Sequence, residues 1–158
     1  MIRIAILMAC HNRRELTLRC LEHLQRASSA DRLEYHVFLV DDGSSDGTAE
    51  AVRGRHPLVH IIQGDGSLFW NGGMRKAWEA AAAHDFDAYV WLNDDTIVAS
   101  RALEALADNM VCTDGHINPD APVIVIGSSR EPGTVVPTYG ELNRTGVVPP
   151  PAVVPRMM

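Results

Sequence analysis

The chain has 158 residues, a net charge of −6, 46% hydrophobic residues and 22% charged residues. These values describe one ordinary globular domain and exclude a wholly disordered chain. The sequence shows neither the basic stripe of a nucleic-acid binder nor an apolar run of about 18 residues that could span a membrane. Three cysteines without a CxxC spacing favour free thiols in a reducing compartment over a disulfide framework or a zinc site.

Short apolar runs alternate with helical patterns along most of the chain. Strands are predicted over residues 2–8, 35–40, 58–62, 87–92 and 123–126. Helices are predicted over residues 13–27, 74–83 and 100–110. A further helix is predicted to begin at a cap formed by Ser45 or Asp46 and to end at residue 55. The glycine-rich segment GDGSLFWNGG, residues 64–73, is expected to be a loop before the third helix.

Strands that alternate with helices predict an α/β fold with a mostly parallel sheet and helices on both faces. Residues 1–129 are expected to form this domain. Residues 130–158 are proline-rich and are expected to be an extended tail. The ligand crevice of such a sheet lies beyond the carboxyl ends of its strands.

The first, second and fourth predicted strands all end in polar motifs, CHN, DDGSSDG and NDD. Because the carboxyl ends of parallel strands share one edge, their side chains should converge there. The residues concerned are His11, Asn12, Asp41, Asp42, Asp94 and Asp95.

Four carboxylates at one edge repel one another, so we expect a bound cation to offset their charge. Oxygen ligands without cysteine suit Mg²⁺ or Mn²⁺, and Mg²⁺ commonly takes one or two carboxylates together with substrate phosphates. The alternative is that these acids cap helices and form turns. That alternative has more weight for the DDGSSDG acids than for Asp94 and Asp95, which follow an apolar strand directly.

Four blocks, ILMACHNRRELTLRCLEHL, VFLVDDGSSDGT, GDGSLFWNGGMRKAW and YVWLNDDT, resemble glycosyltransferase family 2, which has the GT-A fold. The aromatic loop resembles the rhamnosyltransferase-like branch. The resemblance implies an inverting transferase that uses a UDP- or dTDP-sugar, Mg²⁺ or Mn²⁺, and a saccharide or lipid-linked acceptor. It also implies a location in the cytoplasm or at the inner face of the membrane.

The resemblance assigns the nucleotide base to residues at the ends of the first two strands. Ala9 and His11 match positions that touch the base, and His11 replaces the usual tyrosine. Asp42 matches the residue that hydrogen-bonds the base, and Asp41 lies beside it.

The sugar and metal end is assigned to the fourth strand and to the aromatic loop. Asp95 matches the metal ligand, and Asp94 matches a second contact to metal, ribose or sugar. Asn93 replaces an acid found in many members. Gly72, Gly73 and Arg75 match the donor-binding segment, although Arg75 could equally be a solvated helix charge.

No general base can be assigned, because the resemblance implies that it lies in the second half of the domain, which we expect to be missing from this chain. We therefore expect a donor-binding fragment of a longer transferase, truncated on its C-terminal side. The first alternative is a non-catalytic nucleotide-sugar-binding module. A nucleotidyltransferase is a weaker alternative, since CHNRRE has no glycine-rich phosphate loop, and the order of the acids argues against a phospho-receiver domain.

Overall fold

A computed structural model of the chain describes residues 1–27 and 33–110. The chain divides into two compact units, Met1–Glu104 and Ala105–Met158, and the account below concerns the first. The elements in chain order are β1 (Ile2–Cys10), α1 (Arg14–Ala27), β2 (Leu33–Asp41), α2 (Thr48–Arg55), β3 (His60–Gln63), α3 (Phe69–Ala81), β4 (Ala88–Trp91) and α4 (Ala102–Met110). The strand predicted at 123–126 and the boundary predicted at residue 129 lie outside the described residues.

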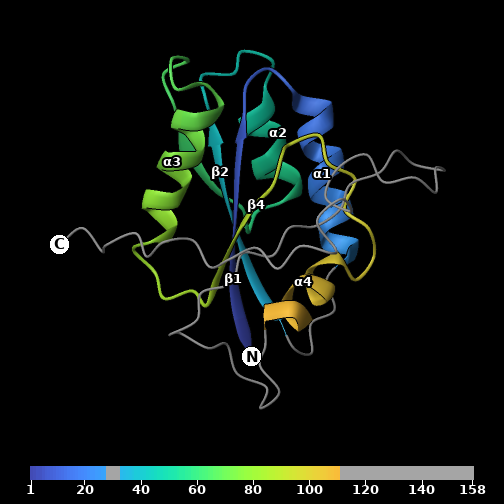
Figure 1. Cartoon of the computed structure of the whole chain (residues 1–158). Coiled ribbons are helices and arrows are strands. Elements are labelled where there is room, and N and C mark those ends of the chain that lie inside the picture. Colours follow the sequence, from blue (N-terminus) through green and yellow to red (C-terminus); the bar gives the residue numbers. More distant parts are fainter. Residues whose placement is uncertain (28–32, 111–158) are drawn as a thin grey trace, which may run out of the picture. The chain divides into compact units, whose positions relative to one another are not determined.

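The four described strands form one parallel sheet in the order β3-β2-β1-β4 (Figure 1). Cys10 of β1 pairs with Asp41 of β2, which in turn pairs with Gln63 of β3. On the other side of β1, Leu7 pairs with Trp91 of β4. The predicted parallel α/β arrangement is confirmed, and the carboxyl ends of the strands lie at one edge.

Helices cover both faces of this sheet, which explains why its central strand reads as a nearly continuous apolar run. Residues 4–8 of β1 are fully buried. On one face, Leu7 and Val40 pack with Met74 and Ala77 of α3. On the other face, α1 and α2 lie side by side (Figure 1).

Helix α3 begins at Phe69, so the prediction of a loop through residue 73 is wrong. The two glycines that suggested a loop lie inside the first turns of the helix. Gly73 lies so close to β1 that a Cβ atom built on it would be 2.7 Å from the Cβ of Ala9. Its small size therefore allows close helix–strand packing, and it does not mark a flexible connection.

The other boundaries differ from the prediction by small shifts at element ends. Asp46, one of the two predicted caps of α2, accepts the backbone N–H of Thr48 at 3.1 Å and that of Arg14 at 3.0 Å. Its carboxylate therefore links the starts of α1 and α2, while Gly47 occupies the N-cap position itself with φ 77°.

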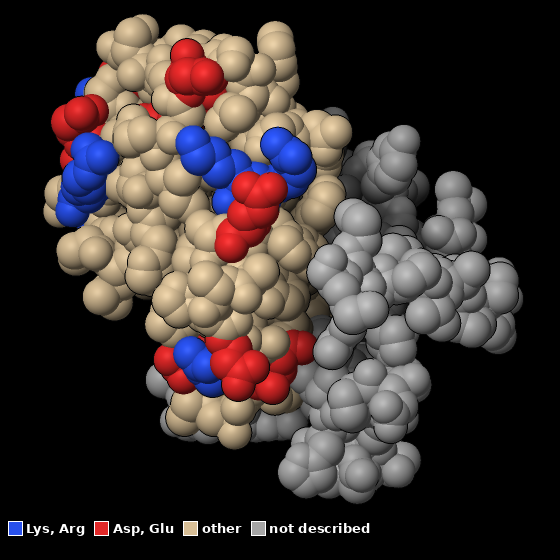
Figure 2. All heavy atoms as spheres, turned by 90° about the vertical axis from the view of Figure 1, so that its left-hand side faces the viewer, with Lys and Arg blue, Asp and Glu red and all other residues tan. Residues whose placement is uncertain are grey.

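Figure 2 shows the face on the α3 side, where acidic and basic side chains are interspersed among uncharged ones. Among the described residues, no helix has the length and apolar character needed to cross a membrane.

Candidate functional site

The polar residues that follow β1, β2 and β4 converge as predicted at the carboxyl edge of the sheet. Cys10, the last residue of β1, lies among them, and burial raises the pKa of its thiol to about 12. The charges of Asp41 and Asp94 raise this pKa as well. The carboxylates from β2 and from the end of β4 therefore lie on either side of the same buried residue.

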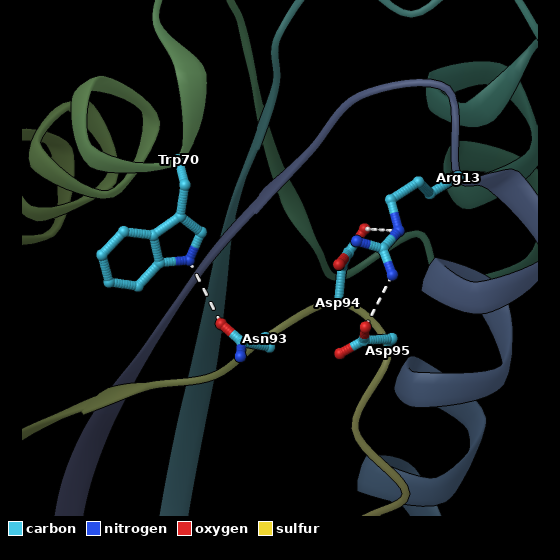
Figure 3. Close-up of a pocket in the computed structure, with 5 residues that line it drawn as sticks. All are labelled: Arg13, Trp70, Asn93, Asp94 and Asp95. Carbon is cyan, nitrogen blue, oxygen red and sulfur yellow. Dashed lines mark hydrogen bonds and ion pairs between the residues drawn. The ribbon is translucent and has the colours of Figure 1, made fainter.

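A pocket of about 310 Å³ opens at this edge and is lined by Arg13, Trp70, Asn93, Asp94 and Asp95 (Figure 3). The Nη2 of Arg13 donates to Oδ2 of Asp95 at 2.6 Å, and its Nε lies 3.4 Å from Oδ2 of Asp94. Across the pocket, the indole N–H of Trp70 donates to Oδ1 of Asn93 at 3.1 Å. The pocket thus contains two acids, one cation and one indole ring.

The two acids of the pocket differ in their surroundings. The side chain of Asp94 is 6% exposed and that of Asp95 is 45% exposed. Burial raises the pKa of Asp94, while the neighbouring Arg13 lowers it and Asp95 raises it. The hydroxyl of Thr17 donates to Oδ2 of Asp94 at 3.5 Å, which fixes that carboxylate against α1. Asp95 is therefore the accessible member of the pair.

The carboxylate of Asp42 is bound by backbone groups of the segment that leads into α3. Its Oδ1 accepts the N–H of Gly66 at 2.9 Å, and its Oδ2 accepts those of Leu68 and Phe69, each at 3.0 Å. A Cβ atom on Gly64 would lie 2.4 Å from Oδ1, so this residue must be small. Asp42 thus caps α3 from a distant part of the chain.

Asp41 and His11 are also held by backbone contacts. Oδ1 of the buried Asp41 accepts the N–H of Ser44 at 3.0 Å. The ring of His11 lies with Nδ1 2.5 Å from the carbonyl oxygen of Asp42 and Nε2 2.9 Å from Nδ2 of Asn12. These contacts fit a neutral ring that carries its proton on Nδ1, with the ring itself exposed.

Groups within the protein offset part of the repulsion among the four acids. Arg13 offsets the charges of Asp94 and Asp95, and backbone N–H groups stabilise the carboxylates of Asp41 and Asp42. One guanidinium faces two carboxylates, so only part of the charge is offset within the protein, and the use of a metal stays a prediction.

Seven of the eight predicted donor residues are absent from the lining of this pocket: His11, Asp41 and Asp42, described above, and Ala9, Gly72, Gly73 and Arg75. Ala9 and Gly73 pack against each other between β1 and α3, and Gly72 lies against Leu68. Arg75 has a side chain that is 77% exposed and lies 3.8 Å from Glu79, one turn along α3. The geometry brings Asp94 and Asp95 together but leaves Arg75 on a solvated helix face.

Sequence reasoning missed Arg13 and Thr17, which both contact Asp94. It treated Arg13 only as the start of a helix. The position of Arg13 in the sequence could have indicated this contact. A basic residue soon after the first strand lies at the same edge of the sheet as the acids that follow the fourth strand.

Among the described residues, no group of three or more His, Cys, Asp or Glu side chains is arranged to hold a metal ion. Asp94 and Asp95 nevertheless fit a Mg²⁺ or Mn²⁺ ion that takes its other ligands from water and from substrate phosphates. The guanidinium of Arg13 already contacts both carboxylates, which shows that a positive charge is stabilised at this point.

Solved structures similar to the chain include a mannosyltransferase and S. aureus TarS, and they show the fold. A mannosyltransferase from Pyrobaculum calidifontis, in complex with GDP-Man and Mn²⁺, has a TM-score of 0.56 and 24% identity, over 69% of this chain and 33% of that one. S. aureus TarS, as residues 1–349, has a TM-score of 0.55 and 18% identity, over 70% of this chain and 33% of that one. The same TarS segment in complex with UDP has a TM-score of 0.52 and 17% identity, over 69% of this chain and 33% of that one.

The architecture is therefore the GT-A fold of glycosyltransferases, as the sequence blocks predicted. The sequence profile of glycosyl transferase family 2 matches residues 5–131, and the chain belongs to that family. No curated protein sequence matches the chain. The chain spans about a third of the length of the similar structures, with 33% of each of the first two covered.

Proposed function

We propose that this chain binds a nucleotide-diphospho-sugar, and that it is the donor-binding part of an inverting, metal-dependent glycosyltransferase. The observation that carries the proposal is the Asp94–Asp95 pair. In this family 2 chain, the pair begins three residues after the end of the parallel strand β4 and lines a pocket with an arginine and a tryptophan. This combination suits a charged, partly apolar ligand such as a sugar linked to a diphosphate.

The similar structures support this class of ligand. The mannosyltransferase holds GDP-Man and Mn²⁺, and the TarS segment holds UDP. For this chain we propose a UDP- or dTDP-sugar, with Mg²⁺ or Mn²⁺ held by Asp95 and Asp94. The metal would supply positive charge that stabilises the diphosphate as it leaves.

We assign the base end of the donor to Ala9, His11, Asp41 and Asp42. The exposed ring of His11 offers a face on which a base can stack. The carboxylate of Asp42 already accepts three backbone hydrogen bonds and the residue is 4% exposed, so at most one acceptor position is left for a base.

The remaining assignments concern α3 and the acceptor. Gly72, Gly73 and Arg75 stay in the proposal as the donor-binding segment, with Arg75 reaching the donor only if it leaves Glu79. A general base is unassigned. The acceptor, a saccharide or a lipid-linked saccharide, and a location in the cytoplasm or at the inner face of the membrane belong to the same proposal.

Calorimetric titration of the 158-residue chain with UDP or dTDP, with and without Mn²⁺, tests the proposal. We expect binding that Mn²⁺ strengthens, and we expect Asp95→Asn to remove the effect of Mn²⁺. Asp85→Asn makes the same charge change at an exposed position before β4 and should bind as the wild type does. If neither nucleotide produces heat under either condition, the proposed function is wrong.

Transferase assays separate the enzyme from the non-catalytic binding module. We expect weak or absent transfer by this chain, because its general base is unassigned. Binding of the donor without transfer would agree with either a donor-binding part or a binding module. Repeated turnover on a defined saccharide acceptor would show that the chain contains a complete active site.

A further inference from the structure

We propose that Arg13 is an internal counter-ion of Asp94 and Asp95, and that it competes with the divalent cation for these two carboxylates. The inference rests on the proposed function, since it concerns the same pocket. Arg13, which is not among the predicted donor-binding residues, thereby has a regulatory role. In the absence of donor, Arg13 keeps the affinity of the pocket for metal low.

The geometry places one guanidinium group against both acids. Nη2 of Arg13 lies 2.6 Å from Oδ2 of Asp95, and Nε lies 3.4 Å from Oδ2 of Asp94 (Figure 3). A cation that binds both carboxylates through these oxygens is repelled by the guanidinium and competes with it for their lone pairs. The contact is therefore a direct competition for ligand atoms as well as a charge effect.

The side chain of Arg13 can leave while its backbone stays in place. Its carbonyl oxygen accepts the N–H of Thr17 at 2.9 Å, which fixes the residue at the start of α1. The side chain is 42% exposed, and its strongest partner, Asp95, is 45% exposed. Both groups are in contact with solvent, so the side chain of Arg13 can rotate into water while the start of α1 stays folded.

Competition by Arg13 couples the metal to the donor. A divalent cation alone must displace Arg13 and gains only two carboxylates and water. A cation that arrives with a diphosphate also gains phosphate ligands, and these contacts offset the free energy that displacing Arg13 costs. By linkage, metal and nucleotide should each increase the affinity of the chain for the other.

The decisive measurement is the affinity for Mn²⁺ in the absence of nucleotide. Electron paramagnetic resonance, which detects free Mn²⁺, monitors this binding. We expect Arg13→Gln to bind Mn²⁺ about tenfold more tightly than the wild type, which corresponds to about 1.4 kcal/mol. Arg13→Lys keeps the charge and should lie between the two. Arg14→Gln makes the same charge change at the next residue, whose side chain faces Glu15, and should alter the affinity by less than about twofold.

A second measurement uses the wild-type chain and therefore does not depend on whether Arg13→Gln folds. Nuclear magnetic resonance of the arginine Nε–H groups during titration with diamagnetic Mg²⁺ should show the Arg13 signal moving while that of Arg14 stays. An unmoved Arg13 signal, or equal Mn²⁺ affinity in Arg13→Gln and the wild type, overturns the inference. If nucleotide binding still depends on Mn²⁺ in that case, the proposed function stands and only the role of Arg13 fails.

Discussion

Asp42 is almost fully removed from solvent, with 4% of its surface exposed, and its carboxylate is bound only by backbone N–H groups of a distant segment. A buried carboxylate is costly unless such donors surround it. Two of these bonds satisfy the amides of Leu68 and Phe69 at the start of α3, which otherwise have no partner within the helix, and the third holds Gly66 in the preceding loop. One side chain therefore stabilises both its own charge and the loop that ends at Phe69.

Asp42→Ala should lower the free energy of unfolding by about 1–3 kcal/mol, because it leaves amides at the start of α3 without acceptors. Urea unfolding followed by circular dichroism measures this loss. Asp65→Ala is the matched control, since Asp65 is exposed and caps only Ser67 within the same loop. Equal losses in the two variants would show that the Asp42 network does not stabilise the fold.

Asp94 presents the opposite case, a buried acid whose charge is incompletely compensated. Burial raises its pKa above the ordinary value despite the nearby guanidinium of Arg13. A group whose pKa is higher in the folded state stabilises the fold below its unfolded pKa, and this contribution is lost as pH rises through the folded pKa. At neutral pH the ionised carboxylate of Asp94 therefore reduces stability.

Asp94→Asn should raise the free energy of unfolding by about 1 kcal/mol at neutral pH, because it removes the buried charge while its amide oxygen still accepts from Thr17. The gain should shrink as the pH falls into the range where the wild-type acid is protonated. Thermal unfolding across this pH range measures both effects. A variant that is less stable than the wild type at neutral pH would mean that the Arg13 pair outweighs the cost of burial.

At the scale of elements, α3 matters most for the site, because it brings Trp70 to the pocket and closes one face of the sheet. Its distance from β1 is set by Gly73, which lies against Ala9. Any larger residue at this position would push the first turns of α3 away from the strand. The position of Trp70 relative to Asn93 therefore depends on a glycine that touches neither of them.

Gly73→Ala should destabilise the protein by about 1–3 kcal/mol, because the added methyl group would lie 2.7 Å from the Cβ of Ala9. Gly54→Ala is the control inside α2, where a Cβ atom has nothing within 4 Å. That change should stabilise the protein by about 0.4–1 kcal/mol. Denaturant midpoints give the comparison, and a shift of Gly73→Ala in the same direction as the control would contradict the packing argument.

Most element boundaries could be predicted because their causes are local. The leucine spacing of α1 and the apolar run of β1 lie within the segments that they define. The start of α3 could not be predicted in this way, since its cap comes from Asp42, which lies 27 residues before Phe69. A glycine pair that faces a strand also looks the same in sequence as a glycine pair in a loop.

At the scale of the whole sheet, the alternation of strands and helices predicted a parallel arrangement, but not the order β3-β2-β1-β4. That order places β1 between β2 and β4, and so brings the acids of residues 41–42 and 94–95 to the two sides of one strand end. Strand order depends on which neighbours bury the most apolar surface together. Such long-range packing has no local signature.

The sequence by itself determined the family, the parallel α/β fold and the edge at which the polar residues gather, because strand ends and their motifs are neighbours along the chain. Only the tertiary structure decided which groups each of the four acids contacts. Asp42 is occupied by the backbone of α3 and its preceding loop, while Asp95 remains open to solvent beside Arg13. The reason is distance along the chain, since Arg13 and Asp95 are 82 residues apart and meet only when β1 and β4 pair.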